Sequence, residues 1–202
     1  MPRSADATRQ RILDAAYREF RKKGYSRVGV DEVAAAAKIT KRTLYYHFKS
    51  KDNLLAAVLE SQHKHLVIGL DALNTSASND ALAVIEGIFK RLTEWASRPR
   101  WTASGFTRVA VELADLPGHP ARAIAKRHKA HMETYLGAMF ASCGVTASSQ
   151  LGREVWMLAE GAMVMILIHG DLAYSDAAAD AAKKLLVASG QKRRWRNKRR
   201  GK

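Results

Sequence analysis

Apolar residues recur along most of the chain at the spacing of three or four residues that is typical of an amphipathic helix. No segment shows a convincing alternation of apolar and polar residues, which would indicate a β-strand. We therefore expect an all-α protein of about nine helices. Their approximate ranges are 8–23, 30–37, 40–48, 51 to the polar stretch 74–79, 80–97, 101–115, 120–142, 149–169 and 176–189.

The ends of these predicted helices carry residues that commonly begin or end a helix. Gly24 follows the first helix, where a left-handed residue is expected. Thr40 and Ser50 precede the third and fourth helices and can cap them with their hydroxyls. Pro120 suits a first helical position, because the N–H that proline lacks would have no partner there.

Residues 30–48 combine two short helices and a tight turn, which is the pattern of a helix-turn-helix. In the second of these helices, Leu44 and Phe48 are four residues apart and therefore share a face. We expect that face to pack on three residues of the first helix, namely Val33, Ala34 and Ala37.

The rest of the second helix carries cations and tyrosines. Lysine and arginine can bind phosphates or guanine edges. A tyrosine hydroxyl can bond to a phosphate while its ring lies against a thymine methyl. Contact with DNA is therefore one interpretation; the alternative is that the tyrosines are half-buried packing residues and the cations a solvated face. The residues concerned are Lys41, Arg42, Thr43, Tyr45, Tyr46 and His47.

The net charge of +15 is concentrated at the two ends of the chain. Residues 1–51 carry 13 Lys/Arg and 5 Asp/Glu, whereas residues 52–190 carry 13 and 14. Residues 191–202 carry 8 Lys/Arg and no acid. This distribution favours an anionic partner. For residues 191–202 we expect a disordered, solvated tail, with nonspecific attachment to DNA as the functional alternative.

Several other classes of protein are disfavoured. Cys143 is the only cysteine, so an intrachain disulfide or a cysteine metal cluster cannot form. The most apolar run, 163–168, is too short to cross a bilayer, and the N-terminus has no apolar signal segment. We find no nucleophile–base arrangement, glycine-rich phosphate loop or paired carboxylates. We therefore expect a cytoplasmic protein that is not an enzyme, with no cofactor and no membrane partner.

Residues 29–55, GVDEVAAAAKITKRTLYYHFKSKDNLL, resemble the N-terminal DNA-binding domain of the TetR family of bacterial transcriptional regulators. The part TLYYHFKSKDNLL is a close match, and the preceding helix matches as well. The resemblance covers about 6–66 and places a helix-turn-helix at about 29–48. It implies that 67–190 form a helical domain that binds an effector and dimerises.

The resemblance also implies which residues contact DNA. The chain departs from the family at two points. Val28-Gly29 replaces a frequent Ser/Thr pair, so a hydroxyl cap is missing, and Arg42 stands where a small residue is frequent and can add base readout. The residues implied to contact bases or nearby phosphates are Lys41, Arg42 and Thr43, next to the cap Thr40. Those implied to contact the DNA backbone are Tyr45, Tyr46, His47 and Lys51.

By the same resemblance, the C-terminal domain holds a pocket for an unknown and largely apolar small molecule. The alternative is that each of these side chains is simply core. His128 and His131 share a stripe, but two histidines without an obvious third ligand do not predict a metal site. The candidate lining residues are Phe89, Trp95, Trp101, Phe106, His131, Met132, Tyr135, Met139, Trp156 and Met163.

Residues 149–169 are too apolar for a solvated helix. Ala159, Gly161 and Ala162 offer a patch of small residues that permits close approach of another helix. We expect this helix and the helix at 176–189 to form a four-helix interface between two copies of the chain, with two helices from each copy. Burial within one subunit is the alternative.

The function implied by the resemblance is that of a ligand-responsive repressor, which binds a palindromic operator in double-stranded DNA as a homodimer. The alternative is an architectural or nucleoid-associated protein, with no effector and little sequence preference. The basic tail favours the architectural protein, and the sizeable C-terminal domain favours the regulator.

Overall fold

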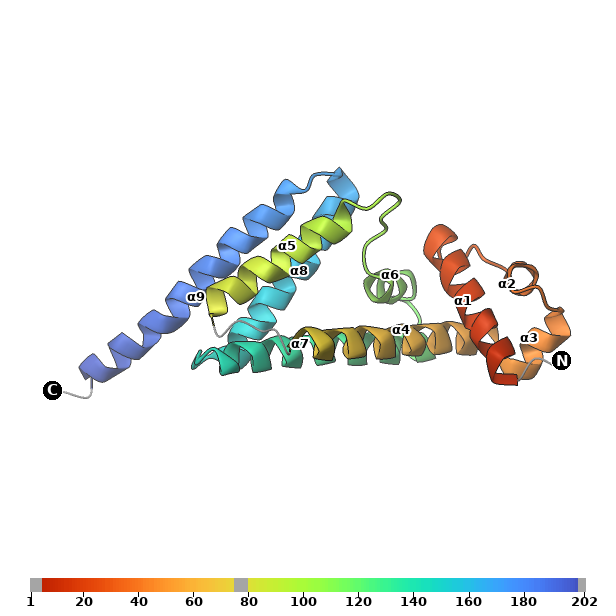
Figure 1. Ribbon diagram of the computed structural model, residues 1–202, viewed down its shortest axis with the longest axis horizontal. Helices are drawn as coiled ribbons and strands as arrows, with labels where there is room; N and C mark the ends of the chain where they lie inside the picture. The colour runs from red at the N-terminus through yellow and green to blue at the C-terminus, as the bar shows by residue number, and fades with distance from the viewer. Residues whose placement is uncertain (1–4, 75–79, 200–202) are drawn as a thin grey trace. The chain divides into compact units, whose positions relative to one another are not determined.

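The computed structural model describes residues 5–74 and 80–199, with side chains described for 5–68 and 80–189. Within these ranges the chain forms nine helices and no strand (Figure 1), so the predicted all-α class is confirmed. The helices are α1 Ala5–Lys23, α2 Val30–Ala36, α3 Lys41–His47, α4 Lys51–Asn74, α5 Ala81–Ala96, α6 Gly105–Glu112, α7 Pro120–Ser142, α8 Ser148–His169 and α9 Ala173–Arg199.

Two helices differ clearly from their predicted lengths. The helix predicted over 101–115 is confined to Gly105–Glu112, because Arg100 and Ala103 both have a φ of 58°, which an α-helix cannot contain. The last helix continues to Arg199 and so includes most of the segment for which the sequence predicts disorder. No proline interrupts that segment.

The predicted caps at Gly24, Thr40 and Ser50 are confirmed. Gly24 has a φ of 89°, and its N–H donates to the Phe20 carbonyl at 2.9 Å. The Thr40 hydroxyl accepts the Thr43 N–H at 3.1 Å. The Ser50 hydroxyl accepts the Asn53 N–H, also at 3.1 Å. Local chemistry therefore sets where α1 ends and where α3 and α4 begin.

The chain folds into two compact units. The first unit contains residues up to Asp71 together with Ser104–His128, and the second contains Ala72–Ala103 and the residues from Lys129 onward. The sequence predicts a different division, with boundaries near residues 66 and 190. Helix α6 and the start of α7 join the first unit because their apolar side chains enter its core, among them Phe106, Val109, Leu113, Ala121 and Ala125.

The second unit is built on α5, α8 and α9, which lie side by side (Figure 1). Its core contains the fully buried Ile85, Phe140 and Val155. The buried hydroxyl of Ser175 donates to the Phe89 carbonyl at 3.1 Å, so no polar atom of that side chain is left unpaired.

Helices α7 and α8 approach closely at a pair of glycines. A Cβ added to Gly152 would lie 2.5 Å from the Gly137 nitrogen and 2.8 Å from its Cα. Both are backbone atoms, which cannot move away without displacing a helix. Glycine at position 152 is therefore a requirement of this packing.

No helix within the described residues is long and apolar enough to cross a membrane.

We expect Gly152→Ala to destabilise the second unit by about 1–3 kcal/mol, because the added methyl overpacks a backbone contact. All four tryptophans belong to this unit, so urea unfolding followed by tryptophan fluorescence measures the effect. Gly87→Ala in α5 is the matched control. Its Cβ would meet only the end of the Arg91 side chain, so helix propensity should make it neutral or stabilising. Equal midpoints for the two variants would contradict this account.

Candidate nucleic-acid interface

Helices α2 and α3 are joined by a short turn that contains one unusual backbone conformation. Lys38 has a φ of 54° and is not glycine. The turn is closed by two backbone hydrogen bonds of 3.0 Å, from Lys38 N–H to the Ala35 carbonyl and from Ile39 N–H to the Ala34 carbonyl. This geometry turns the chain within a few residues and starts α3 at the Thr40 cap.

One face of α3 is fully buried, as the sequence predicts. Leu44 is 0% exposed and Phe48 is 4% exposed. Both belong to the core of the first unit, together with the three α2 residues that the sequence analysis assigned to this contact, namely Val33, Ala34 and Ala37. Because α3 has seven residues and could not be stable alone, this contact is what holds it in place.

The opposite faces of α3 are open to solvent. Tyr46 is 82% exposed and Tyr45 is 42% exposed. The Tyr46 ring makes an edge-on contact with His47, with 5.3 Å between centroids. The alternative that both tyrosines are packing residues is therefore wrong for Tyr46. Lys41 and Arg42 are exposed one turn before the tyrosines, so cationic and aromatic side chains adjoin on the same surface.

Lys41 is held by an acid from the neighbouring helix. Its Nζ lies 3.0 Å from Asp31 Oδ2, in the first turn of α2. The hydrogen bond to Asp31 raises the pKa of Lys41 above its ordinary value. The side chains of Lys41 and Asp31 are 52% and 76% exposed, so the pair lies on the open surface beside Arg42.

Lys51 occupies a more enclosed position than the α3 cations. Its ammonium lies 4.2 Å above the ring of Tyr25, and burial lowers its pKa. The Tyr25 hydroxyl donates to Asp52, and burial, followed by that carboxylate, raises the pKa of Tyr25. The hydrogen bond from Tyr25 in turn lowers the pKa of Asp52. The predicted phosphate-binding Lys51 is thus fixed by the residues that join α1 to α2.

His119, in the turn before α7, packs against the same tyrosine. The ring centroids of Tyr25 and His119 are 5.8 Å apart. His119 Nδ1 accepts the Ala121 N–H at 3.1 Å, so its other nitrogen, Nε2, carries the proton. That nitrogen lies 3.5 Å from Asp52 Oδ1, too far for a strong hydrogen bond.

Glu112, at the end of α6, binds the turn between α1 and α2. Its carboxylate accepts the N–H of Ser26 at 2.7 Å and the N–H of Tyr25 at 3.2 Å. Burial opposes ionisation, but the hydrogen bonds from Ser26 and Tyr25 and the charge of Arg108 leave the pKa of Glu112 below its ordinary value. A residue of α6 therefore positions the segment that leads into the helix-turn-helix.

The predicted effector residues are distributed over both units. Phe106 lies in the core of the first unit, where it stacks on the buried His128 at 3.7 Å. His128 Nδ1 is 3.1 Å from His63 Nδ1, a pairing that the sequence analysis did not foresee. The core of the second unit contains or contacts seven of the others, namely Phe89, Trp95, Trp101, Tyr135, Met139, Trp156 and Met163.

The second unit also contains a partly buried ion pair beside one of its tryptophans. Lys129 pairs with Glu160, and its ammonium lies 5.2 Å above the Trp156 ring. Burial lowers the pKa of Lys129, although the charge of Glu160 opposes this effect. The two remaining predicted lining residues, His131 and Met132, are half-buried on α7, the helix of Lys129.

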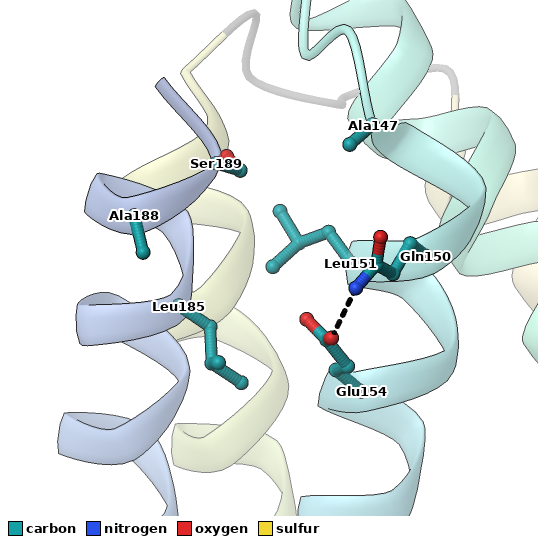
Figure 2. A pocket seen from close by; sticks show the side chains of 7 residues that line it. All are labelled: Ala147, Gln150, Leu151, Glu154, Leu185, Ala188 and Ser189. Carbon is teal, nitrogen blue, oxygen red and sulfur yellow. Dashed lines mark hydrogen bonds between the residues drawn. The ribbon is translucent and has the colours of Figure 1, made fainter. Parts of the chain in front are cut away.

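A hollow lies between the start of α8 and residues 185–189 in the middle of α9 (Figure 2). On its α8 side, Gln150 donates to Glu154 at 2.8 Å, so two of its polar side chains are already paired. None of the predicted effector residues lines it, and the effector-binding assignment stays a prediction. Its lining residues are Ala147, Gln150, Leu151, Glu154, Leu185, Ala188 and Ser189. Among the described residues, no group of three His, Cys, Asp or Glu side chains is placed to hold a metal ion.

Sequence reasoning missed Asp31, Glu112 and His119 as residues of this region. Asp31 had a usable signal, since the start of α2 and the start of α3 must meet in a helix-turn-helix. Glu112 and His119 lie more than 65 residues from the atoms they bind, and no local pattern connects them.

The comparisons with known proteins agree with this geometry. The family model for bacterial regulatory proteins of the tetR family matches residues 12–58. The HTH-type transcriptional regulator AcrR of Shigella flexneri is 39% identical over 62 residues, which are 31% of this chain and 29% of that protein. The HTH-type transcriptional activator FasR of Mycolicibacterium smegmatis is 41% identical over 75 residues, 37% of this chain and 34% of that protein. The matched segment thus spans about a third of these relatives' length.

Similarity to solved structures extends over most of the chain. A TetR-family transcriptional regulator from Streptomyces coelicolor has a TM-score of 0.79 and 25% identity, over 90% of this chain and 95% of that one. A TetR transcriptional regulator from Legionella pneumophila has a TM-score of 0.76 over 92% and 99%, and its 21% identity supports the fold alone. Residues 12–58 match the helix-turn-helix DNA-binding domain of TetR-family regulators, and the chain has the fold of such regulators over most of its length.

We expect Glu112→Gln to weaken the hold of α6 on the turn at Tyr25, because a neutral amide accepts hydrogen bonds less strongly than a carboxylate. The Tyr25 and Ser26 amides should exchange faster at neutral pH, and the unit should lose about 1 kcal/mol or less, since Glu112 is partly exposed.

The sign of the pH dependence follows from the lowered pKa of Glu112. Its contribution is present above the ordinary glutamate pKa and is lost as the pH falls through the folded value. The difference in stability between wild type and Glu112→Gln should therefore shrink in acid. Glu154→Gln, whose partner is the Gln150 side chain on the same helix, is the control. Unchanged exchange at Tyr25 and Ser26 would refute the role of Glu112.

Proposed function

We propose that this protein is a transcriptional regulator that represses its target genes by binding a palindromic operator as a homodimer. The observation that supports this most directly is the 82% exposure of Tyr46 on a helix with a cationic start. Together with Lys41 and Arg42, the exposed ring forms a surface of cationic and aromatic side chains that DNA can contact. A phosphate can accept a hydrogen bond from its hydroxyl, and the ring can lie against a thymine methyl.

The same surface supports roles for the other residues of the interface. Lys41 and Arg42 begin α3, where a recognition helix places its base-reading side chains. Arg42 is the residue we assign to a guanine edge, because its guanidinium can make a bidentate contact. The remaining contacts are assigned to bases or nearby phosphates for Thr40 and Thr43, and to the backbone for Tyr45, His47 and Lys51.

Regulation by a small molecule is the second part of the proposal. A ligand can change operator occupancy only through a difference in its affinity for the DNA-binding state and another state. The aromatic core of the second unit, with the Lys129–Glu160 pair beside Trp156, offers apolar surface and polar groups for such a ligand. The nine candidate lining residues of the second unit are retained as the proposed effector site, whereas Phe106 belongs to the core of the first unit.

Dimerisation through α8 and α9 is the third part. Met157, Gly161, Val164 and Ile168 follow one another at the spacing of a helical stripe, and each is exposed in the single chain. Val187 of α9 is 63% exposed. Apolar residues at this density on one helix face support a second copy as the occupant.

An effector-independent architectural protein is the competing function. The +8 of residues 191–202 favours it, because nonspecific binding depends on the number of phosphates neutralised. The similarity of the whole chain to TetR-family regulators favours the regulator.

We expect selection from random duplex DNA at moderate salt to recover a palindrome whose half-sites lie about one helical turn or more apart. Arg42→Ala should keep the palindrome but relax one symmetric pair of positions, at a cost of about 1–3 kcal/mol per base contact. Sequencing of the retained DNA measures both effects. If no motif is recovered and binding is lost as salt rises, the protein is an architectural DNA-binding protein and the proposed regulator is wrong.

We expect the double variant Met157→Asp with Ile168→Asp to be monomeric at micromolar concentration. Burying these two side chains contributes about 1.5–3 kcal/mol each, so charges there should weaken the dimer at least about 100-fold. Sedimentation velocity measures the change. Val111→Asp in α6, where valine is 71% exposed, is the matched control and should leave the dimer intact. A wild-type monomer would refute the interface.

A further inference from the structure

Residues 29–48 contain two acids, Asp31 and Glu32, which are adjacent and point to different partners. Glu32 pairs with Lys23 at the end of α1. Asp31 pairs with Lys41 at the start of α3, with 3.0 Å between Oδ2 and Nζ. Of these two acids, only Asp31 places its carboxylate beside a cation of α3.

The pair with Lys41 has no evident role in holding the helix-turn-helix together. Its side chains are 76% and 52% exposed, and ion pairs this exposed add little to stability. The contact between α2 and α3 is already made by Leu44, which is fully buried. An acid that faces a phosphate surface also weakens binding to DNA in general. Acids in the first turn of α2 stabilise its N-terminus, which has no side-chain cap, but Glu32 supplies such a charge as well, so this effect does not depend on Asp31 in particular.

We infer that Asp31 is a specificity-determining residue, which holds Lys41 away from phosphates and accepts a hydrogen bond from a base amino group. This inference rests on the proposed function. Where a base pair presents the cytosine N4 or adenine N6 amino group, the carboxylate gains a donor and Lys41 is free to bind an acceptor nearby. Where the groove offers only acceptors at that point, the carboxylate is desolvated without a partner, and binding is weakened.

The two consequences are separable. Binding to arbitrary DNA is reduced because one cation per protomer is already paired. Binding to the operator is preserved because the base amino group replaces Lys41 as the partner of Asp31. Specificity is the ratio of the two affinities, so Asp31 raises it without adding to the affinity for the operator.

Asp31→Asn tests the inference, with Glu32→Gln as the matched control of equal charge in the same helical turn. Lys23 remains paired with Glu19 at 3.1 Å when Glu32 is changed, so the control releases no cation. For Asp31→Asn we expect several-fold tighter binding to random duplex. The slope of log K against log salt should steepen by about 0.9 per protomer, the value for one added phosphate contact. Glu32→Gln should leave both unchanged.

The selected motif gives the second readout. Wild type should require cytosine or adenine at one symmetric pair of positions. Asp31→Asn should relax that requirement alone, because its amide can donate to the acceptors of guanine or thymine as well as accept from an amino group. Equal effects of both variants would mean that Asp31 acts only through the net charge of the domain, and this would overturn the inference. So would an unchanged motif, or a lowered melting temperature as the only effect of Asp31→Asn. A wild-type protein without any motif would refute the proposed function as well, whereas a motif that Asp31→Asn leaves intact refutes only this inference.

Discussion

The burial of Leu44 is the contact on which the DNA-binding surface depends. A helix of seven residues has too few internal hydrogen bonds to offset the entropy of ordering it, so α3 exists only while one face is packed. Leu44 and Phe48 supply that face. Because these two side chains make the packing contacts, the other residues of α3 do not need to be buried. That division explains how a tyrosine can stand in solvent on a well-ordered helix.

The support for this surface is not local. Glu112 binds the turn after α1 from a helix that begins more than 75 residues later, and His119 and Asp52 flank the same Tyr25. The first unit therefore contains two sets of supporting contacts: the apolar core beneath α3 and the polar contacts around Tyr25. The second unit is organised differently, around close backbone contact at Gly137 and Gly152 and an aromatic core.

Much of this could be predicted from the sequence, and the reasons are physical. Helical periodicity is a local property, so most helices could be predicted to within a few residues, with the C-terminal end of α9 as the largest difference. The caps at Gly24, Thr40 and Ser50 could be predicted as well. The packing of Leu44 followed from spacing alone. The late start of α6 was missed because Arg100 and Ala103 adopt positive φ without being glycine. The roles of Phe106, Glu112 and His128 were missed because their partners are distant in sequence, and only the folded chain brings them together.

The turn between α2 and α3 has a consequence for how this domain can vary. Lys38 holds a left-handed conformation in which a side chain costs about 1 kcal/mol relative to glycine. The chain keeps the lysine there, exposed, three residues before Lys41. Conformational ease and positive charge thus compete at a single position. A glycine would relax the backbone and remove a cation from the margin of the surface, so stability and electrostatic attraction to DNA cannot both be maximal in this turn.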